Sequence, residues 1–124
     1  MSEALRSNVP FHGKTVRDFL KMPTDWGDAY TTSVTASRLD LGRWVRMDSG
    51  SAMTYTIPPD SSVQFQDGEF IMLVQKGAGQ VTVTAGSGVT INSAGGLLAT
   101  SQQYSTVTVV KEDANTWIAF GDRA

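Results

Sequence analysis

The sequence contains no cysteine, a single histidine and no long apolar run. The lack of cysteine excludes disulfide bonds, thiolate nucleophiles and zinc sites with cysteine ligands. No stretch of about 18 apolar residues occurs, and no basic and apolar leader is recognisable, so we expect neither membrane insertion nor a signal peptide. Ten basic and twelve acidic residues give a formal net charge of −2, which offers no electrostatic basis for nucleic-acid binding.

Acids and bases are also missing from the centre of the chain. Between Lys76 and Lys111 the sequence has no Asp, Glu, His, Lys, Arg or Cys residue. General acid–base and nucleophilic catalysis depend mainly on those side chains. We therefore expect this stretch to build a sheet and not an active site.

What the centre does contain is alternation of apolar and hydroxyl-bearing residues. Residues 81–84 read Val-Thr-Val-Thr and residues 89–92 read Val-Thr-Ile-Asn. This period of two is typical of strands with one buried and one exposed face. Gly86-Ser87-Gly88 between them predicts a tight reversal, because glycine readily adopts positive φ.

Similar runs follow one another along residues 29–124, with turn signals every eight to twelve residues. They predict one all-β domain of eight or nine short strands, an antiparallel β-sandwich or a small barrel of jelly-roll type. Residues 69–74 form a nearly continuous apolar run, which predicts the most buried strand, covered on both faces. The other expected strands are residues 30–36, 43–47, 53–57, 63–65, 105–112 and 116–120.

Residues 1–28 lack strand alternation and are predicted to form a non-β N-terminal arm. Thr15 is a suitable helix cap for one or two turns ending before Pro23. Two interpretations remain open: the segment closes one end of its own domain, or it lays aromatic side chains on another subunit or protein. In the second interpretation the candidate partner-binding residues are Phe11, Arg17, Phe19, Leu20, Lys21 and Trp26.

Several motifs resemble catalytic or ligand-binding signatures only superficially. Gly77-Ala78-Gly79 is followed by an expected strand, whereas a phosphate loop needs a helix after it. His12 has no partners at metal-ligand or triad spacing. Carboxylate pairs such as Asp25 with Asp28 lie at turns, where such groups are commonly solvated. We therefore expect no enzyme, no metal and no cofactor.

The aromatic residues of the strands have two interpretations. Trp44 and Trp117 are expected in the core, because large aromatics in a sheet usually pack there. Tyr55 and Tyr104 are candidates for surface recognition, since a phenol hydroxyl requires water or a partner and an exposed ring can stack on a sugar.

Residues 43–124 also carry a series of short motifs, which are Val45-Arg46-Met47, Ile57-Pro58-Pro59-Asp60-Ser61-Ser62-Val63-Gln64-Phe65, Gly77-Ala78-Gly79-Gln80-Val81-Thr82, Gly88-Val89-Thr90-Ile91-Asn92-Ser93-Ala94-Gly95, Gln103-Tyr104-Ser105, Trp117 and Gly121-Asp122. With these motifs the chain resembles a small β domain of tailed-phage virion proteins, found at the ends of tail fibres and head fibres. Residues 1–28 match nothing in it.

The resemblance implies a non-enzymatic structural protein of the virion, made in the host cytoplasm and assembled as a homotrimer. A small β domain behind a short arm fits a capsid decoration (cementing) protein or a short head fibre, whose partner would be the major capsid protein or another virion protein. The alternative is a receptor-binding module of a tail fibre or tail tip that recognises host surface glycans.

Overall fold

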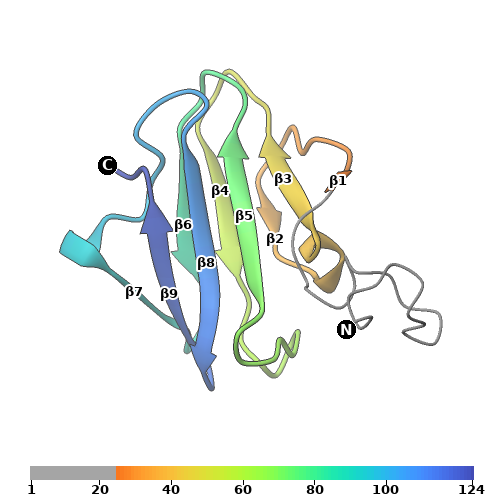
Figure 1. The fold of residues 1–124 in the computed structure, drawn as a ribbon, viewed down its shortest axis with the longest axis vertical. Helices are drawn as coiled ribbons and strands as arrows, with labels where there is room; N and C mark the ends of the chain where they lie inside the picture. Colours follow the sequence, from red (N-terminus) through yellow and green to blue (C-terminus); the bar gives the residue numbers. More distant parts are fainter. Residues whose placement is uncertain (1–24) are drawn as a thin grey trace, which may run out of the picture.

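The computed structural model describes residues 25–124, which form two β-sheets (Figure 1). The larger sheet has the strand order β1-β3-β5-β8-β9-β7, with bounds β1 Asp25–Trp26, β3 Arg43–Met47, β5 Phe70–Gln75, β8 Thr106–Asp113, β9 Thr116–Gly121 and β7 Thr90–Ser93. The smaller sheet has the order β2-β4-β6, with bounds β2 Val34–Thr35, β4 Met53–Ile57 and β6 Val81–Ala85.

Helix is limited in residues 25–124 to two 3-10 turns, η1 Arg38–Asp40 and η2 Ala94–Gly96. None of the helices in this part of the chain has the length and apolarity needed to cross a membrane. The all-β prediction is therefore confirmed, and neither sheet closes into a barrel over the described residues. The helix expected after Thr15 lies outside these residues.

Successive strands alternate between the two sheets. β1, β3 and β5 lie in the larger sheet, and β2, β4 and β6 lie in the smaller one. Trp44 pairs with Met72 and Met53 pairs with Val81, so residues 28 positions apart lie side by side in both sheets. The chain from β1 to β6 thus forms a coil of stacked turns, each turn giving one strand to each sheet.

This coil makes most of the strand pairing parallel. Among the pairings of named strands in residues 25–124, the antiparallel ones are those of β8 with β5 and β9, and two isolated bridges, Thr82 with Ala99 and Thr100 with Arg123, are antiparallel as well. The other five pairings of named strands are parallel, so the antiparallel, jelly-roll-like prediction is wrong for them. Gly86-Ser87-Gly88 accordingly joins β6 to β7 in the other sheet and forms no hairpin, whereas the turn at Asn115 does join a hairpin, β8–β9.

The glycines of Gly77-Ala78-Gly79 let one turn of the coil lie directly on the previous one. A Cβ atom on Gly79 would stand 1.9 Å from the carbonyl oxygen of Ser51, and one on Gly77 would stand 2.4 Å from that of Ser49. The Gly79 amide instead donates to the Ser49 carbonyl at 2.8 Å. The prediction that these glycines belong to a turn between strands is confirmed.

Side chains from the inner faces of both sheets form one hydrophobic core. Trp117, as expected from the sequence, is fully buried, and its ring meets Phe65 edge-on with centroids 5.3 Å apart. The main contributors are Val45, Met47, Ile71, Leu73, Val107, Val109 and Ala119 from the larger sheet and Met53, Tyr55, Ile57, Val81 and Val83 from the smaller sheet.

β5 departs from the expectation that both its faces are covered. Ile71, Leu73 and Gln75 are buried, whereas Phe70, Met72 and Val74 are only partly buried. The second set points away from the core because side chains alternate along a strand. The nearly continuous apolar run therefore reflects an apolar outer face of the larger sheet.

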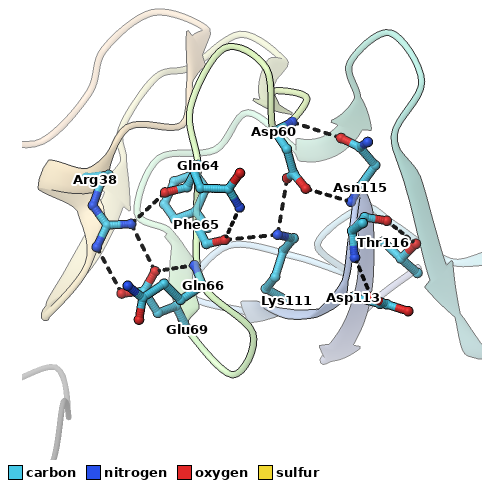
Figure 2. Close-up of polar contacts among 11 residues, drawn as sticks. Arg38, Asp60, Gln64, Phe65, Gln66, Glu69, Lys111, Asp113, Asn115 and Thr116 are labelled. Carbon is cyan, nitrogen blue, oxygen red and sulfur yellow. Dashed lines mark hydrogen bonds and ion pairs between the residues drawn. The ribbon is translucent and has the colours of Figure 1, made fainter.

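The loop between β4 and β5 is fixed by an ion pair between the buried Lys111 and the partly exposed Asp60, shown in Figure 2. The Lys111 ammonium group, which is 2% exposed, lies 3.1 Å from Asp60 Oδ1 and donates to the Phe65 carbonyl at 2.9 Å. The Asn115 amide donates to Asp60 Oδ2 at 3.0 Å. Burial opposes the charge of Asp60, but the bonds from Asn115 and Lys111 outweigh it and lower the pKa of this carboxyl.

A second pair fixes the other end of the same loop. Arg38 Nη1 and Nη2 each lie 3.0 Å from an oxygen of Glu69, and Nη1 also donates to the Gln64 carbonyl at 2.9 Å (Figure 2). The hydrogen bond to Glu69 raises the pKa of Arg38. Asp60 and Phe65, two residues of the motif that carries the resemblance, therefore have structural roles.

Candidate interaction surface

The outer face of the larger sheet carries a row of large side chains across five strands. The register places Trp26 beside Trp44, Trp44 beside Met72, Met72 beside Thr108 and Thr108 beside Phe120. A second, shorter row joins Phe70, Val110 and Ile118. We call the residues of these two rows the apolar face.

One end of the apolar face is a tryptophan pair on the neighbouring strands β1 and β3. The ring centroids of Trp26 and Trp44 lie 5.9 Å apart, and Trp26 is 54% exposed. The Arg46 guanidinium lies 5.1 Å from the centre of the Trp26 ring, and its Nη2 donates to the Gly27 carbonyl at 2.6 Å. Cation–π contact and hydrogen bond together fix the orientation of an exposed aromatic ring.

The middle of the apolar face is hollowed into a shallow groove. Phe70, Met72, Thr108, Val110 and Phe120 line it. Phe120 stands at the β9 side of the groove and is 51% exposed. None of the lining residues is charged, so a ligand of this groove would be recognised by apolar contact and shape.

An apolar patch of this extent has a physical consequence. Covering such a surface with another apolar surface is favourable by about 25 cal/mol for each Å² of apolar area removed from water. Contiguous exposed patches are uncommon on monomeric proteins and mark sites of association. The arrangement lends itself to docking a protein segment or subunit, and it holds no acid–base pair suited to catalysis.

Tyr55, a predicted surface-recognition residue, is instead fully buried. Its hydroxyl donates to the carboxylate of Asp40, which is 1% exposed, and Tyr30 donates to the same carboxylate at 2.5 Å. Burial and the hydrogen bond to Asp40 raise the pKa of Tyr30 to about 12, and burial with the charge of Asp40 raises that of Tyr55 well above its usual value. The prediction for Tyr55 is wrong because its β4 position points into the core.

Tyr104, the other predicted surface-recognition residue, lies on the surface. It is 69% exposed and has φ of 71°, in the left-handed region that non-glycine residues seldom occupy. Its amide donates to the Gln75 carbonyl at 2.6 Å, and the neighbouring Gln103 donates through Nε2 to the Lys76 carbonyl at 3.0 Å. These bonds hold the exposed ring on an ordered loop.

Of the predicted arm residues, only Trp26 lies within the described part of the chain; Phe11, Arg17, Phe19, Leu20 and Lys21 lie outside it. Asp25–Trp26 pairs with β3, so the end of the predicted arm joins the sheet. Sequence reasoning missed Met72 and Phe120. It also predicted that Trp44 lies in the core, whereas in the structure Trp44 is half-buried on the outer face of the larger sheet. The alternation of Trp44 with the buried Val45 was the available signal.

Residues 25–124 contain no cluster of three or more His, Cys, Asp or Glu side chains that could hold a metal ion. No family model, curated protein or solved structure matches the chain significantly.

Proposed function

We propose that this chain is a structural protein of a tailed-phage virion, a homotrimeric capsid decoration protein or short head fibre attached through its N-terminal arm. The body is a two-layer β-sandwich, and the partner is the major capsid protein or another virion protein. The observation that carries the proposal is the apolar face, which begins at Trp26, where the arm joins the sheet.

Two further features support it. The motif residues behind the resemblance to phage β domains serve to build the body, as the contacts of Asp60 and Phe65 show. The arm and the apolar face are contiguous at β1, so a shell protein can contact both at once. A trimer would carry three such attachment surfaces and would bind the shell by avidity.

The test combines mass measurement with particle binding. Light scattering of the full-length chain at micromolar concentration should give three times the chain mass of 13.3 kDa. The purified protein should bind emptied capsids in a pull-down and should not bind host cells. A variant lacking residues 1–24 should keep the β circular-dichroism spectrum of the full chain but lose capsid binding.

The matched control changes Arg17 and Lys21 to Ser and leaves Phe11, Phe19 and Leu20 in place. Retained binding of this control would assign the attachment to the aromatic and aliphatic side chains. A monomeric mass would overturn the trimer, and capsid binding by the shortened chain would overturn the anchoring role of the arm.

Tyr104 favours a second candidate function, a receptor-binding tail-fibre or tail-tip module that recognises host surface glycans. An exposed aromatic ring held on an ordered loop provides a stacking surface for a sugar ring. In this case the protein should bind host cells, and Tyr104→Ala should abolish that binding without changing the melting temperature by more than about 1 °C. Binding to capsids with no binding to cells would reject this candidate.

A further inference from the structure

The outer face of the smaller sheet carries hydroxyl groups in a regular arrangement. Each of its three strands places a residue that faces the core between two residues with hydroxyl side chains. These triplets are Ser33-Val34-Thr35 at β2, Thr54-Tyr55-Thr56 in β4 and Thr82-Val83-Thr84 in β6. Tyr55 and Val83 are buried, whereas the hydroxyl-bearing residues beside them are exposed or partly exposed, because successive side chains of a strand point to opposite faces.

The parallel pairing brings the triplets into register. Thr35 lies beside Thr56, and Thr56 lies beside Thr84, so one row of three threonines crosses the sheet. The Oγ1 atoms of Thr56 and Thr84 are 2.9 Å apart and share a hydrogen bond. The second row consists of Ser33, Thr54 and Thr82. We call the residues of these two rows the hydroxyl grid.

The backbone sets the spacing of the hydroxyl grid. Neighbouring strands lie about 4.8 Å apart, and two residues along a parallel strand advance by about 6.6 Å. Threonine is stiff at χ1 and the strands are already ordered, so the hydroxyl groups keep these positions with little further loss of conformational entropy on binding. The grid therefore presents polar atoms at two fixed repeats, as the surface of a crystal does.

The chain around the hydroxyl grid is free of charged residues. Residues 29–37, 49–59 and 77–110 include all three triplets and contain no Asp, Glu, His, Lys or Arg. A protein surface in contact with water usually has charged residues at about 25–35% of its positions. Because solubility favours charge, a charge-free outer face indicates a ligand that charged side chains would disturb.

The surface of ice has the properties that this face selects, because it is uncharged, rigid and periodic in two directions. Oxygen atoms on the prism face of ice repeat at distances close to the two spacings of the hydroxyl grid. Each lattice water donates and accepts hydrogen bonds. A serine or threonine hydroxyl group does both as well, so it can occupy the place of a lattice water.

We propose that the hydroxyl grid binds the surface of ice and slows the growth of ice crystals. The bound protein covers the lattice plane on which further water would freeze. The inference goes beyond the proposed function. The core lies between the two sheets, so the grid and the apolar face are on opposite sides of the body. A protein attached to a shell through the apolar face therefore keeps its grid free.

Slow freezing of a dilute solution onto a cooled probe provides the test, because growing ice leaves ordinary proteins in the liquid. Thr54 is exposed in the middle strand of the grid, and Thr54→Lys replaces its hydroxyl group by a flexible, strongly hydrated ammonium group. The fraction of protein that enters the ice should be at least about tenfold higher for the unmodified full-length chain than for Thr54→Lys, which corresponds to about 1.4 kcal/mol of binding free energy. Thr35→Lys, at an exposed position of the other row, should have the same effect.

The matched control is Thr90→Lys, the same change at an exposed position of β7 in the larger sheet. This control should enter the ice as the unmodified protein does, and thermal melts should show that all three variants stay folded. Exclusion of the unmodified protein from the ice would overturn the proposal, as would equal entry of the grid variants and the control. If no chain entered the ice and Thr54→Lys lowered the mass measured by light scattering, the face would be an interface between copies, which also overturns the proposal.

The freezing test uses no phage particles or host cells. Loss of capsid binding would leave the entry into ice unaffected, and exclusion from ice would leave capsid binding unaffected. The inference and the proposed function can therefore fail separately.

Discussion

Replacing Tyr55 by phenylalanine removes one hydroxyl group from the buried Asp40 site and leaves the packing of the ring unchanged. The Asp40 carboxylate then keeps the Tyr30 hydroxyl at 2.5 Å and the longer contact from the Ser37 amide at 3.4 Å. A hydrogen bond to a charged group contributes about 1.5–3 kcal/mol. Because Asp40 is 1% exposed, water cannot readily replace the lost donor.

We therefore expect Tyr55→Phe to lower the free energy of unfolding by about 2 kcal/mol, which corresponds to a fall in Tm of about 8 °C or more for a domain of this size. Tyr104→Phe is the matched control, since it removes the hydroxyl of an exposed tyrosine that has no side-chain hydrogen bond among residues 25–124. Urea denaturation and thermal melts at pH 7 measure both variants. Equal stability of the two would refute the assigned role of the Tyr55 hydroxyl.

The same site predicts how stability depends on alkaline pH. Tyrosine in an unfolded chain has a pKa near 10, whereas the folded protein holds that of Tyr30 at about 12 and that of Tyr55 well above its usual value. Between these limits the unfolded state releases protons that the folded state keeps, so stability is complete below about pH 10 and falls as pH rises toward 12. The decline of Tm over this interval should be shallower in Tyr55→Phe.

Three further predictions concern the body. Gly79→Ala should lower the free energy of unfolding by about 2 kcal/mol or more, because the new Cβ would stand 1.9 Å from a backbone oxygen. The control Gly50→Ala meets no atom within 4 Å and should leave the stability nearly unchanged. Equal stabilities of the two variants in urea denaturation would contradict the stacked turns. Lys111→Ala removes the charged donor that bonds the Phe65 carbonyl in the core and should lower the free energy of unfolding by about 2 kcal/mol in the same assay. The exposed Lys76→Ala should lower it by less than about 0.5 kcal/mol. Hydrogen bonds from Ser101 and Ser105 lower the pKa of Asp122, so the stability that the ionised Asp122 contributes is present above about pH 4 and is lost as pH falls further. In Asp122→Asn the fall of Tm below pH 4 should therefore be shallower. An unchanged slope of Tm against pH would contradict this role of Asp122.

Most of the strands could be predicted from the sequence, whereas their pairing could not. Residues 63–65, predicted as a strand, lie instead in the loop between β4 and β5, and of residues 30–36 only Val34–Thr35 forms a strand. Runs such as residues 43–47 and 53–57 alternate locally, and alternation depends only on the two faces of a strand. The same alternation occurs in parallel and antiparallel sheets, so it gave no information on direction. The 28-residue offset that pairs Trp44 with Met72 left no obvious repeat, since the paired residues are seldom identical and pairs such as Arg46 with Val74 differ in polarity.

The candidate surface depended on that missing information. Trp26 was identified from the sequence, but Met72 and Phe120 become neighbours of the same row only once β8 and β9 are known to follow β5. The apolar run of residues 69–74 was correctly taken as a strand. Its outer side chains were assigned to a covered face because apolarity alone does not distinguish burial in the body from a surface awaiting a partner.

The β8–β9 hairpin ends a pattern that could otherwise repeat indefinitely. β8 runs antiparallel along the edge of β5 that a further parallel strand would use, and the Leu98 carbonyl accepts a 2.9 Å hydrogen bond from Val83 at the corresponding edge of β6. Both sheets are thereby blocked at the end of the coil that β5 and β6 form. The hairpin thus serves as a terminator: a chain deprived of it would present a bare strand edge, the template from which proteins polymerise end to end into fibrils.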